Sequence, residues 1–237
     1  MPKAIDVMTN SIGMKLVWMP TSTFQMGSNN GYDNEKPVHS VNLTKGFWVG
    51  QYDVTQEEYQ KVIGNNPSNF KGSCNPVDQV SINDAVKFCT KLSQKEGKIY
   101  ALPTEAQWEY ACRAGSNANY CFGDTEGQLD DYAWYRGNSS GKTHPVGQKK
   151  PNAFGLYDMH GNVWEYCLDW YEEGFYGRNM NADPLNKNYG DKKFRILRGG
   201  SWTDLNFHCR SANRSIYVPG YTSYSIGFRV LIVSDGL

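Results

Sequence analysis

The stretch Arg195–Val230 constrains this chain most, because its ends and its middle differ in character. The run Phe194–Leu197 leads into Gly199-Gly200, and the stretch closes on Ile226–Val230, followed by the apolar Leu231-Ile232-Val233. Both ends are short and apolar, contain β-branched residues, and include glycines that let backbones approach closely. We therefore predict that a buried strand lies at each end.

The middle of this stretch, from Thr203 to Ser225, does not have the composition of a core. It contains no Lys or Glu, and Asp204 is its one acid; three tyrosines stand among Ser, Thr and Asn. Tyrosine supplies contact area at low entropic cost, and Ser and Asn supply adaptable hydrogen bonds, as in adaptable binding surfaces. We predict that the two strands hold up a ligand-contacting segment. An ordinary long surface loop is the alternative with the same composition.

Three tyrosines within this segment carry the binding prediction. Tyr217, Tyr221 and Tyr224 follow neither a strand nor a helix period. We therefore expect them to face solvent as contact residues.

Charge and hydropathy exclude several classes of partner. The 237 residues have a formal net charge of zero, whereas nucleic acids and anionic membranes reward a basic excess. We therefore expect no nucleic-acid partner. No apolar run approaches the roughly 18 residues that a membrane span needs, so we expect no direct span. The opening residues lack the apolar core of a secretion signal, although a chain whose leader had been removed would look the same.

The six cysteines do not form a metal-binding or disulfide pattern. They lie far apart, with no C-x-x-C and no zinc-type pairing with histidine. Because cysteine packs readily as a small apolar residue, we expect mostly buried free thiols.

One capping box and two helix caps predict the helices. In the box, the Thr55 hydroxyl and Glu58 satisfy each other's free backbone amides, and the caps stand at Ser81 and Thr104. We expect helices over 55–63, 81–96 and 104–114, each ended by a glycine. Strands are predicted at Lys15–Pro20 and Phe24–Met26, and a hairpin is predicted from 38–43 and 47–54.

The segment 116–150 is rich in Gly and Asn and too long for a simple connector. We expect the aromatic residues Tyr132, Trp134 and Tyr135 to be buried and to hold it. No linker or charge run divides the chain, so we predict one α+β domain over residues 1–237, with the display segment at about 199–230.

Several motifs in a fixed order resemble one known family. GMKLVWMPTSTFQMGS, FWVGQYDVTQEEYQ, LPTEAQWEYACRAG, NAFGLYDMHGNVWEY and RILRGGSW are similar to the formylglycine-generating enzyme, or sulfatase-modifying factor, family. The resemblance covers about residues 12–233. It implies the formylglycine-generating variant of the C-type-lectin-like fold, which is irregular, with few helices and short strands.

The sequence departs from the enzymes of this family at their catalytic position. Those enzymes carry a pair of cysteines just after the RGGS motif, for copper-dependent oxidation of a peptide cysteine. Here the corresponding segment, 202–208, contains no cysteine, and Cys209 stands where the family has a packing residue. We therefore expect no copper and no catalysis. The alternative is a sulfatase-modifying-type copper oxidase, or an inactive relative.

A second resemblance concerns the ending RGGSW…CRSANR…P…IGFRV. It is similar to variable proteins of diversity-generating retroelements, most closely to their treponemal member. The resemblance implies a cell-surface protein, lipid-anchored through a leader outside this sequence, that binds a protein or other surface ligand; we expect a monomer. The framework would be Gly199–Trp202, Cys209–Ala212, Arg214, Pro219 and Ile226–Arg229. The ligand-contacting residues would be Trp202, Thr203, Asp204, Leu205, Asn206, Phe207, His208, Asn213, Ser215, Ile216, Tyr217, Val218, Gly220, Tyr221, Thr222, Ser223, Tyr224 and Ser225.

The turn Asp158–Glu165 is a candidate for structural calcium. Backbone carbonyls of Asp158, Gly161 and Val163 and the Glu165 carboxylate would supply hard oxygen ligands, and the family places a calcium ion at this GNxWE motif. The alternative is that Asn162 and Glu165 only bond local amides.

Four arginines lie within the framework motifs, and they are Arg198, Arg210, Arg214 and Arg229. We expect them to pair with buried carboxylates such as Glu165 or Asp169 rather than with an acidic ligand.

Overall fold

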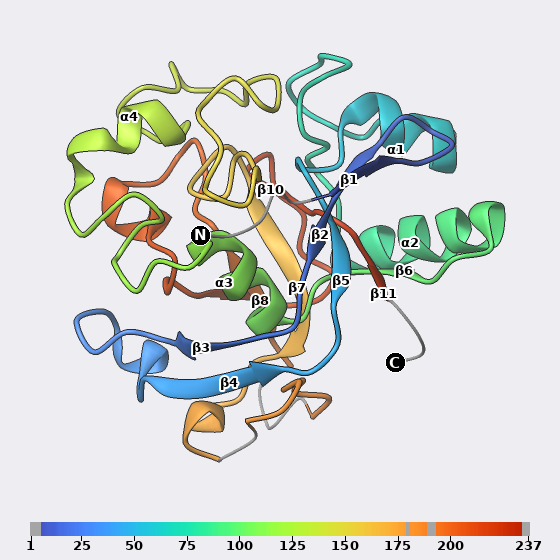
Figure 1. Cartoon of the computed structure of the whole chain (residues 1–237). Helices are drawn as coiled ribbons and strands as arrows, with labels where there is room; N and C mark the ends of the chain where they lie inside the picture. Colours follow the sequence, from blue (N-terminus) through green and yellow to red (C-terminus); the bar gives the residue numbers. More distant parts are fainter. Residues whose placement is uncertain (1–5, 179–180, 189–192, 234–237) are drawn as a thin grey trace.

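A computed structural model describes residues 6–178, 181–188 and 193–233 of the chain (Figure 1). Two sheets hold most of the strands, and a two-stranded ribbon completes them. The first sheet has the order β1 (Val7–Thr9), β2 (Lys15–Met19), β5 (Phe47–Gly50), β11 (Leu231–Val233) and β6 (Tyr100–Ala101). The second has the order β10 (Ile226–Gly227), β7 (Trp164–Trp170), β8 (Arg195–Arg198) and β9 (Ser215–Tyr217). The ribbon pairs β3 (Ser22–Met26) with β4 (His39–Leu43).

Three helices begin at the predicted capping residues. They are α1 (Gln56–Ile63), α2 (Ile82–Glu96) and α3 (Glu105–Arg113), and each has a capping box that is complete in both directions. In Figure 1, α1 and α2 lie together on one side, while α3 lies centrally and packs against β3, β7 and β8. A fourth helix, α4 (Leu129–Tyr132), is a single turn. None of the described helices is long and apolar enough to cross a bilayer.

The predicted hairpin over 38–54 is wrong. β4 pairs with β3 in the ribbon, whereas β5 pairs with β2 and β11 in the first sheet. The chain therefore crosses from one sheet to another at Gly46, where an added Cβ would lie 2.4 Å from the Trp18 ring. Pairing with β2 and β11 buries β5 centrally, which a local turn signal does not reveal.

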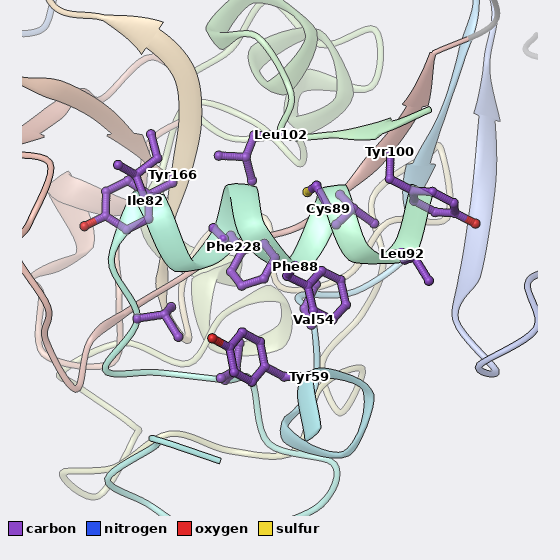
Figure 2. Close-up of a cluster of buried hydrophobic side chains, with 14 of the residues drawn as sticks. Val54, Tyr59, Ile82, Phe88, Cys89, Leu92, Tyr100, Leu102, Tyr166 and Phe228 are labelled. Carbon is purple, nitrogen blue, oxygen red and sulfur yellow. The ribbon is translucent and has the colours of Figure 1, made fainter. Parts of the chain in front are cut away.

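Two apolar clusters lie on either side of the central strands. In the first, Phe88 on α2 stacks on Tyr59 and meets Phe228 edge-on (Figure 2). In the second, Trp108 on α3 packs with residues of β2, β4, β5 and β8. Buried residues of the second sheet belong to both clusters, so that sheet is fixed from both faces.

The segment 116–150 is held mainly by a residue other than those predicted. Tyr132, Trp134 and Tyr135 are only half-buried, whereas Tyr120 is buried with Leu129 in a small third cluster. The ring of Trp134 stacks on His144 at a centroid distance of 3.8 Å. The single-domain prediction for 1–237 stays a prediction, and residues 1–5 and 234–237 lie outside the described residues.

Candidate ligand-binding surface

The two ends of the C-terminal segment pair with opposite edges of β7. β8 pairs antiparallel with β7, so that Arg198 lies opposite Glu165, and β10 pairs in parallel on the other side, so that Gly227 also lies opposite Glu165. The chain between them leaves one side of β7 and returns on the other. Gly227 has to be small, because an added Cβ would lie 2.5 Å from the carbonyl oxygen of Val77.

The segment begins with a turn that only glycine fits well. Gly199 and Gly200 have φ values of 100° and 74°, which side chains other than glycine rarely adopt. A Cβ on Gly200 would lie 3.1 Å from the Cα of Cys209 and 3.1 Å from the carbonyl oxygen of His208. The turn therefore packs directly against the short 3₁₀ helix Asn206–Cys209.

The framework arginines are buried and paired, as predicted. Arg210 forms a bidentate salt bridge with Glu35, in which Nη1 donates to Oε2 at 2.9 Å and Nη2 donates to Oε1 at 2.7 Å. Arg214 is bonded in the same way to Glu105, with Nη2 to Oε2 at 2.9 Å. Because both acids lie outside the segment, these pairs fasten it to the rest of the molecule.

The other two arginines anchor the ends of the segment. Arg198 pairs with Glu109, which also pairs with Arg113. Burial alone would raise the pKa of the Glu109 carboxyl, but these two guanidinium groups hold it below its usual value. Arg229 pairs with Glu165, as predicted, with Nη2 at 2.7 Å from Oε1.

The predicted partner Asp169 pairs differently. Its carboxylate accepts hydrogen bonds from the backbone amides of Glu105 (2.7 Å) and Asn186 (3.0 Å). Burial raises the pKa of Asp169 to about 7. Asp169 therefore stabilises the backbone and does not form a hydrogen-bonded pair with a framework arginine.

The surface of the segment is unusually apolar. In the described part of the chain, nine large apolar or aromatic side chains are exposed, and six of them gather here. They are Tyr32, Leu205, Phe207, Val218, Tyr221 and Tyr224. Such a concentration is typical of an interaction surface rather than of scattered exposure.

The remaining predicted contact residues divide by burial. Gly220 and Thr222 are exposed, and the half-buried ones are Trp202, Thr203, Asp204, Asn206, His208, Ser215, Ile216, Tyr217, Ser223 and Ser225. Asn213 differs from all of these, because it is 1% exposed and its amide is directed toward Glu35 at 3.4 Å. In this structure Asn213 is part of the support and cannot contact a macromolecule.

Ring contacts pair several of the accessible residues. The Trp202 indole lies against the Tyr224 ring at a centroid distance of 5.5 Å and donates to the Tyr224 carbonyl oxygen at 3.0 Å. Tyr217 and Tyr221 stack in parallel at 4.5 Å. The Tyr221 carbonyl oxygen accepts from the Tyr166 hydroxyl at 2.8 Å, so this part of the segment is also tied to β7.

Glu165, the one carboxylate ligand in the calcium prediction, is engaged by other groups. Both Glu165 oxygens accept from Arg229, and one also accepts from Trp108 Nε1 at 2.8 Å. Asp158 accepts from the Gly147 amide at 2.8 Å through one oxygen. A carboxylate that neutralises a guanidinium is a poor calcium ligand, so Glu165 as placed does not fit the ion. Calcium binding by the carbonyls of Asp158, Gly161 and Val163 stays a prediction.

The thiol nearest the enzymes' catalytic position is inaccessible. Cys209 is fully buried, with Sγ 3.8 Å from the Leu205 carbonyl oxygen. Burial raises its pKa well above the usual value, and the thiolate is the form that attacks or binds metal. All six cysteines are free, and Cys74 alone among them is exposed.

Comparison with known proteins identifies the scaffold. Residues 5–233 match the family described as the sulfatase-modifying factor enzyme 1-like domain. The chain belongs to this family. It is similar to Treponema denticola variable protein 1, with 31% identity, a TM-score of 0.86, and coverage of 98% of this chain and 100% of that one. It is also similar to PvdO from Pseudomonas aeruginosa, with 30% identity, a TM-score of 0.87, and coverage of 98% and 100%.

The family also contains enzymes. The formylglycine-generating enzyme of Streptomyces coelicolor is 36% identical over 65% of this chain and 51% of the enzyme. The chain thus spans about half the length of that relative. The predicted family, the resemblance to the treponemal variable protein and the α+β fold are confirmed. Sequence reasoning missed Tyr32 and Phe70, which lie in loops remote from the segment and next to it in space.

Proposed function

We propose that this protein binds a macromolecular ligand without catalysis, and that its contact residues are those that a retroelement diversifies. One observation carries the proposal. Within 199–230 the framework residues are buried, except for half-buried Trp202 and Pro219, and every residue assigned to the diversified set except Asn213 is exposed or half-buried. A display surface requires this division, because residues that change must not carry the fold.

The chemistry of the segment supports binding over catalysis. An enzyme of the formylglycine-generating type needs a reactive thiol, and Cys209 is buried with a raised pKa. The accessible residues are instead Tyr, Phe, Leu, Ser and Thr side chains on a braced backbone. Rigid aromatic groups of this kind supply affinity at low entropic cost.

The second candidate is a copper oxidase acting on a peptide cysteine, or an inactive relative of one. The identity with the Streptomyces coelicolor enzyme favours it. It is tested by incubating the pure protein with Cu⁺ and a cysteine-containing peptide, and measuring aldehyde formation. Copper-dependent product would revive this function, and only background oxidation is expected.

The setting of the proposed function is the cell surface. We infer this setting, and a lipid anchor contributed by sequence outside this chain, from the resemblance of the C-terminal motifs to variable proteins. We further infer a monomer that binds a protein or other surface ligand. The zero formal net charge argues against a nucleic-acid ligand.

Sequencing tests the proposal directly. We would read the 3′ end of the gene and the DNA downstream in many clones of the source. Substitutions should cluster at codons 203–208, 215–218 and 220–225, opposite adenines in a nearby template copy, and the framework codons serve as the internal control. Invariant contact codons with no template copy would overturn diversification.

A further inference from the structure

Building on the proposed function, we propose that the binding surface is composite. Tyr32, from the loop 27–37, and Phe70, from the loop 64–76, flank the C-terminal segment as fixed aromatic anchors. The partner is a folded protein that presents an uncharged, largely apolar epitope. Both anchors lie far from the segment in sequence and would be the same in every diversified variant.

Tyr32 lies outside the segment in sequence but contacts the segment's Phe207 and His208 rings. Its side chain is 48% exposed. Its ring meets the Phe207 ring edge-on at a centroid distance of 5.2 Å and lies nearly parallel to the His208 ring at 6.4 Å. The Tyr32 hydroxyl is 3.4 Å from His208 Nε2. A ligand that covers Phe207 therefore also contacts Tyr32.

The position of Tyr32 is fixed by the pair that fastens the segment. The Tyr32 amide donates to Glu35 Oε1 at 3.2 Å, and its carbonyl oxygen accepts from the Glu35 amide at 3.0 Å. The same Glu35 carboxylate holds Arg210. One buried acid thus sets both the loop and the 3₁₀ helix that carries Phe207, so their relative position is preorganised.

Phe70 contacts a different part of the segment. Its ring meets the Trp202 ring edge-on at 5.3 Å, and Trp202 in turn lies against Tyr224. Phe70 and Trp202 are half-buried and Tyr224 is 47% exposed, so part of this aromatic group is open to a partner. The row Phe70, Trp202, Tyr224 therefore combines one residue from the loop with two from the segment.

A buried amide fixes the Phe70 loop. Gln56 is fully buried, and its Nε2 donates to the Phe70 carbonyl oxygen at 2.7 Å. Its Oε1 accepts from Asn66 Nδ2 at 2.8 Å and from the Gly72 amide at 3.1 Å. A loop braced at three points loses little entropy on binding, and aromatic groups held in this way are typical binding hot spots.

The charges of the surface define the class of partner. Asp204, the one acid between 203 and 225, accepts from the Trp164 indole at 2.8 Å and from Ser201. Arg210 and Arg214 are buried against their carboxylates. Between 203 and 225 the surface thus offers rings, hydroxyls and amides, and its one acid is already bonded. In the flanking loops Lys36 pairs with Asp33, and Lys71 donates to the Asn66 carbonyl oxygen. Such a surface complements an uncharged protein epitope.

The test uses a defined probe, because it must not depend on an unidentified partner. Residues 203–208, 215–218 and 220–225 are randomised in the full chain, and binders are selected against ubiquitin, a folded protein of near-neutral charge with an apolar patch. Tyr32→Ala and Phe70→Ala are then placed in several independent binders. The matched control is Ile99→Ala, which removes a 49% exposed apolar side chain outside this surface.

Each anchor substitution should weaken ubiquitin binding about tenfold or more in most binders, whereas Ile99→Ala leaves it unchanged. Tyr32→Phe should retain most of the affinity, and thermal unfolding must show that every variant is folded. Raising NaCl from 50 to 500 mM should change Kd less than about threefold.

The failures of the two proposals are distinguishable. If folded library members give no binders, the proposed display function is overturned, and the composite surface with it. If binders arise but lose nothing with Tyr32→Ala and Phe70→Ala, the composite surface alone is wrong. A steep loss of binding with salt would overturn the uncharged epitope.

Discussion

Replacing Glu35 with glutamine tests whether the ion pairs beneath the segment hold it in place. Glu35 is fully buried and makes a two-pronged bond to Arg210, which is itself 3% exposed. Breaking a buried pair by removing one partner leaves an uncompensated charge and costs about 3–5 kcal/mol. For a chain of this size that loss corresponds to a fall in Tm of roughly 10 °C.

The double substitution Glu35→Leu with Arg210→Met should recover more than half of that loss. Replacing a whole buried pair with apolar residues removes the unpaired charge and is often nearly neutral. Recovery stays incomplete, because the Tyr32 amide loses an acceptor in Glu35, at about 1 kcal/mol.

The assay is urea unfolding at pH 7, followed by tryptophan fluorescence. The control is Asp131→Asn, which breaks a pair with Lys150 whose side chains are 51% and 61% exposed. That change should cost less than about 1 kcal/mol. The reasoning is refuted if Glu35→Gln costs no more than Asp131→Asn, or if the double substitution costs as much as the sum of Glu35→Leu and Arg210→Met, each measured alone.

Four further predictions concern a glycine turn, a buried carboxyl group, two thiols and calcium. Gly200→Ala should destabilise the protein by about 2 kcal/mol or more in urea unfolding, because its Cβ meets backbone; Gly64→Ala, with φ of 99° and nothing within 4 Å, should cost about 1 kcal/mol. Burial raises the pKa of Asp158 to about 6. Between pH of about 4 and about 6 the folded state therefore keeps a proton that the unfolded state releases. The contribution of Asp158 to the free energy of unfolding then falls as the pH rises through this range. Asp158→Asn should flatten that fall in unfolding midpoints measured across this range; an unchanged slope would contradict the assignment. A thiol reagent should label Cys74 in the native protein and Cys209 only on unfolding, as peptide mapping would report. Millimolar Ca²⁺ should leave Tm unchanged, and a clear rise would mean that the carboxylates near Arg229 rearrange around the ion.

The helices were predictable because their signals are local. Each capping box at Thr55, Ser81 and Thr104 is satisfied by a residue three positions later, without reference to the rest of the fold. The glycines that end α1 and α2 act within one turn of the helix. Such elements keep their structure in many tertiary settings, so the sequence alone defines them.

Strand partners and ion-pair partners were not predictable in the same way. β5 pairs with β11, which lies at the other end of the chain, and this pairing excludes the hairpin with β4. For Arg210 the residue type predicted a buried carboxylate but not which one, and its partner Glu35 lies 175 positions away. Asn213 was assigned to the surface by the resemblance, yet its neighbour arginines draw it into the support.

The arrangement separates the energy of folding from the energy of binding. The guanidinium groups of Arg210, Arg214 and Arg229 bond to Glu35, Glu105 and Glu165, which lie outside the variable positions, so these pairs form whatever side chains stand at 203–208 or 220–225. Asp204 is an exception, since it accepts from the buried indole of Trp164. A substitution there removes the acceptor of a buried donor, at about 1–3 kcal/mol. Variants lacking an acceptor at 204 should therefore be less stable than variants changed at 205 or 221, and stability should limit diversity at that position more than at its exposed neighbours.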